Sequence, residues 1–225
     1  MKIITLKANE IKEKIATQLK DKLEKEGFMY KKTRNEFRSQ IGDYTYLFIL
    51  EQLSWSDHHS LKVNVAISQN RIEAILEKII GKLRHKYTFW QDLARIYKSP
   101  DGRQIVNGNL AILLIQNEDV EAAVETLEGY YENIAKPYFE RYNSLEAIDD
   151  IMNNPPFEHC PADVGSGFDG RCMKGLIAAR LVNNPKYDEL VAIYDEEIKG
   201  TMNAESIENY HKVRDYLMYN KIALT

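Results

Sequence analysis

The chain has 225 residues, of which 44% are hydrophobic and 28% charged, the composition of an ordinary folded protein with a sizeable core. Its two cysteines are too few for a disulfide framework, no apolar run approaches the roughly 18 residues of a membrane span, and the first residues lack the apolar stretch of a secretory signal, so we expect a cytoplasmic protein. The net charge of −4 is unevenly divided, because residues 1–100 have 19 Lys and Arg against 12 Asp and Glu, whereas residues 101–225 have 11 against 22.

Residues 9–27 predict an amphipathic helix, because apolar side chains recur at every fourth position. The period then changes to two. Residues 44–50 and 61–68 alternate as strands do, and the polar loop at 54–60 predicts that they form an antiparallel hairpin. A third, more polar strand is expected at residues 30–39.

The third strand is expected to end in a turn at Gly42–Asp43. A stripe of isoleucines and leucines predicts a helix over residues 71–84. Asn107-Gly108 is a strong turn signal between two apolar runs. It predicts a second hairpin, in which residues 110–115 after the turn could form a buried strand.

From Glu118 onward the pattern is helical only. Apolar positions keep helical spacing as far as Pro137, which is expected to kink the helix or end it. Ser144 is expected to cap a short helix, and residues 153–170 form a loop by composition. Three further helices are predicted at 171–183, at 185–199 with Pro185 in its first position and Gly200 at its end, and at 204–220.

Together these elements predict an α+β fold, with a small antiparallel sheet and helices followed by an all-helical C-terminal half. We expect residues 1–116 to form the α+β domain and residues 117–225 to form the helical region. A boundary near residue 155 and one continuous domain both remain open.

The first half also resembles a known family. Its order is a helix, the segment GFMYKKTRNEFRSQ, an aromatic-rich strand, the segment SWSDHHSLKVNVAI and a helix that begins NRIEAILEKI. Over roughly residues 9–84 this is similar to the bacterial proteins grouped as domain of unknown function 4304, in which a Gly-Phe-x-Lys-Lys segment leads into a Phe-Arg strand and a sheet. The resemblance carries no catalytic residues. Many such bacterial domains accompany toxin or defence systems, which implies a partner of that kind by association.

Residues 159–172, HCPADVGSGFDGRC, are the segment most suggestive of chemistry. His159, Cys160 and Cys172 supply the nitrogen and sulfur donors that zinc prefers, with a nearby aspartate as a fourth ligand. Strong zinc sites have closely paired cysteines, however, and these two lie twelve positions apart. We therefore favour a turning linker in which Asp169 caps the next helix, and we expect no cofactor.

Two other chemistries are open to the same segment. Gly165, Gly167 and Gly170 precede a helix whose backbone N–H groups could bind phosphate, but their spacing matches neither a Walker loop nor a dinucleotide fingerprint. A cysteine nucleophile paired with a histidine would lack any family signature. An enzyme or small-ligand binder that uses residues 159–172 is the alternative function.

The loop at 54–60 contains Asp57, His58 and His59. Such residues can bind a metal or transfer protons, but neighbours in a strand face opposite sides, so a polar hairpin tip is favoured. Trp55 in the same loop is a natural binding anchor if its side chain is exposed, and a core residue if it is buried.

A basic and aromatic stretch in the first half permits binding of nucleic acid. A charged edge strand, in which Lys and Arg discourage edge-to-edge pairing, is the favoured interpretation, so nucleic acid is not the expected ligand. The residues are Tyr30, Lys31, Lys32, Arg34, Phe37 and Arg38.

Nine of the fourteen tyrosines lie beyond residue 129, in the acidic half. Tyrosine is enriched at protein interfaces, so these tyrosines could form a surface that binds a basic protein, or they could simply pack in the core. We predict a non-enzymatic, protein-binding protein, in its sharpest form an immunity-type neutraliser of a basic toxin that works by steric occlusion with electrostatic steering. The candidate partner-binding residues are Trp55, Tyr130, Tyr194, Asp195 and Glu196.

Overall fold

The chain divides into two compact units, and each unit is assembled from two separate segments. The computed structural model describes residues 7–83, 86–97, 110–154, 156, 164 and 167–220. Unit 1 contains residues 1–66 and 91–140, and unit 2 contains residues 67–90 and 141–225. The division differs from the boundaries expected near 116 and 155, because the helices between residues 119 and 140 pack in unit 1 and the helix that begins at residue 70 packs with the C-terminal helices.

Unit 1 holds most of the sheet and the helices that flank it. Its helices are α1 (Ala8–Lys25), α3 (Leu93–Ile96), α4 (Asp119–Tyr130) and α5 (Lys136–Arg141), with a π-helical turn, η2 (Tyr131–Ala135), between the last two. Its strands are β1 (Met29–Lys31), β2 (Glu36–Ile41), β3 (Tyr44–Ser54), β4 (His59–Gln69), β5 (Phe89–Asp92) and β6 (Ile112–Leu114), with a 3-10 turn, η1 (Lys32–Arg34), after the first. The end of β4, the start of β5 and the last residue of α5 fall in unit 2.

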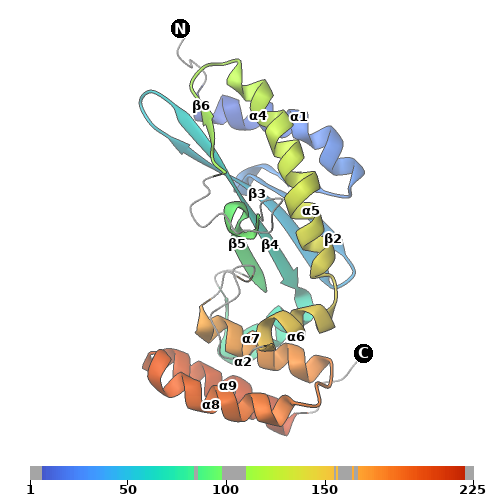
Figure 1. The fold of residues 1–225 in the computed structure, drawn as a ribbon, viewed down its shortest axis with the longest axis vertical. Coiled ribbons are helices and arrows are strands. Elements are labelled where there is room, and N and C mark those ends of the chain that lie inside the picture. The colour runs from blue at the N-terminus through green and yellow to red at the C-terminus, as the bar shows by residue number, and fades with distance from the viewer. Residues whose placement is uncertain are drawn as a thin grey trace. The chain divides into compact units, whose positions relative to one another are not determined.

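The six strands form one sheet in the order β1-β2-β3-β4-β5, and β6 also pairs with β4 (Figure 1). The registers are antiparallel, with Phe37 opposite Phe48 and His59 opposite Leu114. Gly42 makes the predicted turn between β2 and β3 with a φ of 56°, which glycine adopts without strain. An antiparallel sheet with flanking helices and a helical C-terminal half confirms the α+β class.

Aromatic rings fill the space between the sheet and the helices of unit 1. Phe48 of β3 and Phe28, which follows α1, each meet Tyr131 edge to face, with ring centroids 5.9 and 5.6 Å apart. Tyr46 lies 5.2 Å from Phe139 of α5. Such aromatic pairs add roughly 0.5–1.5 kcal/mol each beyond the burial of their surface. The aromatic-rich strand of the sequence is therefore the core of unit 1.

The break expected near Pro137 takes the form of the π-helical turn. A proline in a helix lacks the N–H that the ladder needs, and its ring clashes with the carbonyl four residues earlier. The five residues of η2 lie directly before α5, so the helix widens at this point and continues through Pro137. Lys136 of α5 reaches back to Glu26 at the end of α1, with Nζ and Oε2 3.0 Å apart.

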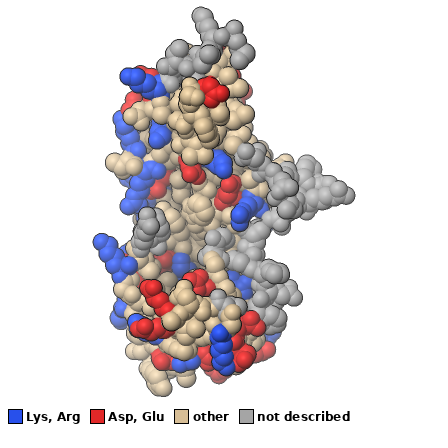
Figure 2. Space-filling view, turned by 90° about the vertical axis from the view of Figure 1, so that its left-hand side faces the viewer, with Lys and Arg blue, Asp and Glu red and all other residues tan. Residues whose placement is uncertain are grey.

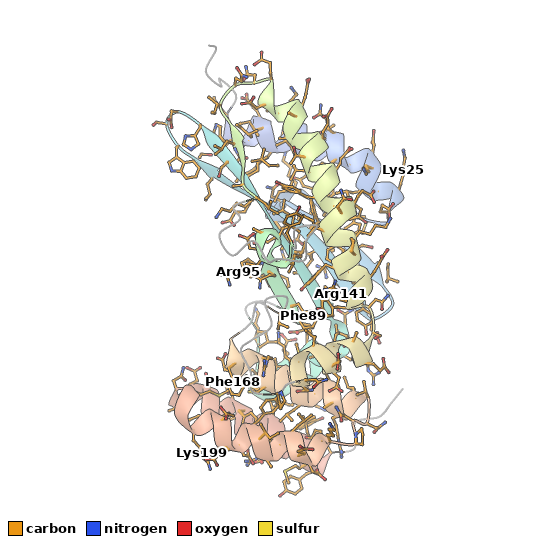
Figure 3. All side chains as sticks on the ribbon, in the orientation of Figure 1. Lys25, Phe89, Arg95, Arg141, Phe168 and Lys199 are labelled. Atoms are coloured by element: carbon orange, nitrogen blue, oxygen red, sulfur yellow. The ribbon has the colours of Figure 1, made fainter. Side chains whose placement is uncertain are left out.

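Unit 2 is a bundle of helices, in which α7 contacts all the others. They are α2 (Asn70–Ile80), α6 (Leu145–Asn153), α7 (Phe168–Leu181), α8 (Tyr187–Thr201) and α9 (Ala204–Tyr219). In Figure 3, Phe168 marks the start of α7 and Lys199 marks the last turn of α8. α7 is buried along almost its whole length, including the charged residues Arg171 and Lys174.

One helix start in unit 2 agrees with the prediction and another departs from it. Ser144 caps α6 as expected, because its hydroxyl accepts a hydrogen bond from the N–H of Ala147 at 3.1 Å. Pro185 is not the first residue of α8, which begins two residues later, because Asn184 closes a capping turn with Lys186.

The expected turn at Asn107-Gly108 lies outside the described residues. No helix in the described part of the chain is long and apolar enough to cross a membrane.

Candidate functional site

The strands β3 and β4 meet in a tight hairpin at the end of the sheet (Figure 1). The N–H of Trp55 donates to the carbonyl of His58 at 2.9 Å, so the turn itself consists of Ser56 and Asp57. This bond sets the register of the hairpin. Residue 54 then lies opposite residue 59, and the hydrogen bond between the Ser54 hydroxyl and Nδ1 of His59, at 2.8 Å, agrees with it.

Trp55 is held in place although its side chain is half exposed. Its ring stacks on the ring of His58, with centroids 4.6 Å apart and planes 10° apart. Nδ1 of His58 lies 2.7 Å from Oδ1 of Asp57. This hydrogen bond lowers the pKa of Asp57, so the carboxylate is ionised at neutral pH and orients the histidine. The sequence left open whether Trp55 is an anchor or a core residue, and the structure exposes it.

Two rows of side chains cross the hairpin and β6 on one face. The β4–β6 register places Ser60 opposite Leu113, and the hairpin places Leu53 opposite Ser60. Two residues further along each strand, Trp55, His58 and Ile115 form the second row on the same face. The four large apolar side chains remain exposed by 37% at Leu53, 50% at Trp55, 57% at Leu113 and 39% at Ile115.

We call Leu53, Trp55, His58, Leu113 and Ile115 the hairpin patch. Alternation along β3 puts it on the face of the sheet opposite Phe48, which packs against Tyr131. Figure 2 views the molecule from the side of the hairpin end, where the surface is mostly uncharged. Contiguous exposed apolar side chains of this kind mark sites of protein interaction.

The β6 side of the patch is fixed by its neighbours. Leu114, between the two exposed residues, is fully buried on the opposite face. Asp119, in the first turn of α4, accepts hydrogen bonds from the N–H groups of Ile115 and Gln116 at 2.8 and 2.9 Å. These bonds to Gln116 and Ile115 lower the pKa of Asp119. The sequence indicated a buried strand here, because a run of apolar residues does not reveal that one face of the strand is open.

The other predicted partner-binding residues are scattered. Tyr130 in unit 1 is half-buried and donates its hydroxyl hydrogen bond to the carbonyl of Leu110 at 3.2 Å. In unit 2, Asp195 pairs with Arg214 at 2.9 Å, and Glu196 is exposed.

Tyr194 corrects the prediction, because it is fully buried. Its hydroxyl donates to Oδ1 of Asn153 at 2.6 Å, and Asn153 donates in turn to Asp149 at 2.6 Å. Asn184 donates to the second oxygen of Asp149, also at 2.6 Å. Burial raises the pKa of Asp149 and that of Tyr194. Helical spacing alone could not separate this core tyrosine from a surface one.

The segment at 159–172 is only partly described. His159 and Cys160 lie outside the described residues. Cys172 lies in the first turns of α7 and is fully buried, and burial raises the pKa of its thiol well above the ordinary value. A buried thiol of this kind is neither a reactive nucleophile nor an open ligand. Among the described residues no group of His, Cys, Asp and Glu could hold a metal ion.

The helix cap expected from Asp169 is also different. Gly167 is the N-cap of α7, and Asp169 lies inside the first turn, where its carboxylate accepts from the N–H of Gly170 at 2.8 Å. The helix therefore begins three residues before the position predicted at 171. An acidic side chain in the first turn is still favourable there, because it faces the positive end of the helix dipole.

Unit 2 also buries an ion pair that the sequence did not reveal. Glu73 of α2 and Lys174 of α7 lie 3.0 Å apart, both buried. The Thr88 hydroxyl donates to Glu73 at 2.9 Å and accepts from the N–H of Gln69 at 2.8 Å. Lys174 also donates to the carbonyl of Tyr87. Lys174 and Thr88 both contact Oε1 of Glu73, whereas Oε2 is buried and accepts no hydrogen bond from a described residue. The contacts fix α2 against α7, so we assign them a structural role.

The basic stretch of the first half does not form one surface. Phe37 is fully buried on the helix side of the sheet, whereas Arg38, its neighbour, faces the other side. Lys32 pairs with Glu13 of α1. Tyr30, in the short edge strand β1, contacts Phe37 with its ring tilted and the ring centroids 5.0 Å apart. The arrangement agrees with an edge of the sheet and not with a continuous basic groove.

No protein-family model matches the chain, and neither a curated protein nor a solved structure matches it significantly. The resemblance of residues 9–84 to domain of unknown function 4304 therefore stays a prediction. What the chain does is inferred from its residues and their geometry.

Proposed function

We propose that this chain is a non-enzymatic bacterial protein of the cytoplasm that binds another protein through the hairpin patch, and that it neutralises a basic toxin. The observation that carries the proposal is the exposure of four large apolar side chains on one face of the sheet, two at the end of β3 and two at the end of β6, on either side of β4. Full burial of a large apolar side chain contributes about 1.5–3 kcal/mol, and because these four are already roughly half covered, covering the rest of each contributes about half of that. Trp55 already stacks on His58, so it loses little freedom when a partner covers it.

The charge of the second half supports a basic partner. Figure 2 shows Asp and Glu gathered on unit 2. Helix α8 alone has Asp188, Glu189, Asp195, Glu196 and Glu197 against Lys199. Acidic surfaces of this kind raise the association rate of a basic partner, while apolar contacts set how long it stays. The toxin would be neutralised because the bound chain covers its working surface.

The first experiment replaces Leu113 with a photo-crosslinking amino acid in the full chain and illuminates it in a lysate of the source organism. We expect one reproducible adduct with a protein of basic composition. The matched controls carry the crosslinker at Met29 or Ile41, which are equally exposed apolar positions on the same sheet, 58% and 64%. An adduct that forms equally at the control positions would contradict the proposal.

The second experiment tests neutralisation. The captured protein is expressed alone and together with the chain, and we expect growth arrest that the chain relieves. A Trp55→Ala/Leu113→Ser variant should lose this relief, whereas Met29→Ser/Ile41→Ser should keep it. If the captured protein does not arrest growth when it is expressed alone, the claim that the partner is a toxin is wrong.

A further inference from the structure

We infer that the hairpin end binds its partner by strand addition, in which an extended segment of the partner pairs with the open edge of β3 at Gln52–Ser54. The inference rests on the proposed function and names its binding mode. Backbone hydrogen bonds supply affinity in this mode, and pockets for alternate side chains supply specificity.

The described strands leave this edge of β3 unpaired beyond Leu50. The pairing of β2 with β3 ends at Ile49, opposite Glu36. Asn35 then closes the ladder: its carbonyl accepts from the N–H of Leu50 at 3.0 Å, and its side-chain amide donates to the Leu50 carbonyl at 2.6 Å. Asn35 has a φ of 51°, which turns the chain away from β3. No described strand pairs with β3 past this point on that side.

The backbone groups of Gln52 and Ser54 therefore point at the open edge. In an antiparallel strand, N–H and C=O of one residue point to the same side, and successive residues alternate between the two sides. Leu50 faces the β2 side, so residues 52 and 54 face it as well. Leu53 and Trp55 face β4, and the Trp55–His58 bond agrees with this.

A strand that pairs here brings alternate side chains onto the hairpin patch. Paired residues share a face of a sheet, so the residue opposite Leu53 and the one next to Trp55 lie on the exposed apolar side. The segment that fits has apolar residues at positions i and i+2. Glu51 and Asp57 flank this apolar pair and are exposed, which favours Lys or Arg at the ends of the segment.

The size of the patch distinguishes such a segment from a second copy of the chain. A stable dimer interface takes roughly 20–30 residues from each partner. The hairpin patch has five side chains and a short stretch of open edge, which matches one extended segment.

The test selects binders from random nine-residue peptides displayed on phage, using the full chain as bait and the Trp55→Ala/Leu113→Ser variant for counter-selection. We expect enriched peptides with apolar residues at alternate positions and a terminal Lys or Arg. Enrichment of apolar residues at i, i+3 and i+4 would indicate a helical ligand and overturn strand addition, as would the absence of any patch-dependent enrichment.

A matched pair of variants then tests the backbone contact with the best selected peptide. Ser54→Pro removes the N–H that faces the edge, whereas Ser54→Ala removes only the hydroxyl bonded to His59. We expect Ser54→Pro to weaken binding at least tenfold and Ser54→Ala to weaken it less than threefold, measured by fluorescence anisotropy. Equal affinities would overturn strand addition. Gln52→Pro against Gln52→Ala repeats the test if Ser54→Pro fails to fold.

The two proposals fail in different ways. If an adduct forms at Leu113 but the selected peptides show a helical pattern or no pattern, protein binding stands and strand addition is rejected. The absence of a specific adduct would reject the proposed function itself. An adduct of two copies of the 26.1-kDa chain would reject both the foreign partner and the strand.

Discussion

Deleting one charge of the buried pair between Glu73 and Lys174 is expected to destabilise unit 2 far more than deleting both. The two groups lie 3.0 Å apart, and their side chains are only 2% and 10% exposed. Lys174→Met keeps most of the packing of the lysine stem. It leaves the Glu73 carboxylate with the hydroxyl of Thr88 as its hydrogen-bond donor. The second carboxylate oxygen, Oε2, is buried and accepts no hydrogen bond from a described residue.

The expected magnitude follows from this geometry. Breaking a buried ion pair by removing one partner costs about 3–5 kcal/mol, because an uncompensated charge stays buried. At about 2–4 °C per kcal/mol for a chain of this size, Tm should fall by roughly 6–20 °C. In Glu73→Met/Lys174→Met neither charge of the pair remains. The Tyr87 carbonyl loses its Lys174 donor in both variants, and the further cost in the double variant is the Thr88 hydroxyl without its acceptor, about 1–3 kcal/mol. The double variant should therefore be more stable than Lys174→Met.

The assay is urea unfolding in a Trp55→Phe background, so that Trp90 reports on unit 2 by fluorescence, with circular dichroism as a second probe. Lys199→Met is the control, because its pair with Glu196 is exposed and should contribute no more than about 1 kcal/mol. A Lys174→Met variant within 1 kcal/mol of the wild type would refute the reasoning. So would a double variant less stable than Lys174→Met.

Three further expectations concern single sites in unit 2. Gly175→Ala should destabilise the protein by about 1–3 kcal/mol, because its Cβ would lie 2.5 Å from Oδ1 of Asn153. Gly200→Ala should stabilise it by up to about 1 kcal/mol, because no atom lies within 4 Å of the added Cβ and alanine favours the helix. Thermal melts of the two variants test the difference. Cys172 should resist alkylation at pH 8 until urea unfolds the chain, and peptide mapping would expose the error if it reacts in the native state. Because burial raises the pKa of Asp149 in the folded state, the contribution of Asp149 to the free energy of unfolding should fall as pH rises from about 4 through that raised pKa. Urea unfolding at a series of pH values should show this fall in the wild type and not in Asp149→Asn.

Regular periodicity made α1 and the β3–β4 hairpin predictable from the sequence. The spacing of Ile11 and Ile15 placed α1, and alternation around Phe48 placed the hairpin, because each pattern reflects one buried face. The strand predicted at 30–39 is two strands, because Asn35 adopts a left-handed conformation that no spacing rule announces. A short polar residue between two strands was the only available signal.

The candidate site was half predictable. Trp55 stood out as a large aromatic residue in a polar loop, but Leu113 and Ile115 read as core, because exposure depends on which face of β6 is covered. Charged residues in a helix are ordinarily solvated, so the burial of Lys174 on α7 could not be inferred without the position of Glu73. Contacts between residues a hundred positions apart carry no local signature.

The assembly of each unit from two segments has a consequence for how the chain folds as it is synthesised. Helix α2 leaves the ribosome long before α7 and α9, against which it packs. At about 5–20 residues per second, the interval before the last helix emerges is on the order of ten seconds. During that time Ile72 and Leu76 have no cover from those helices, and Glu73, which lies between them in sequence, meets its lysine only when α7 arrives. The Glu73 carboxylate therefore stabilises the folded bundle and also keeps α2 hydrated until α7 is synthesised. A chain with an apolar residue at position 73 should aggregate during translation even if the purified protein is stable.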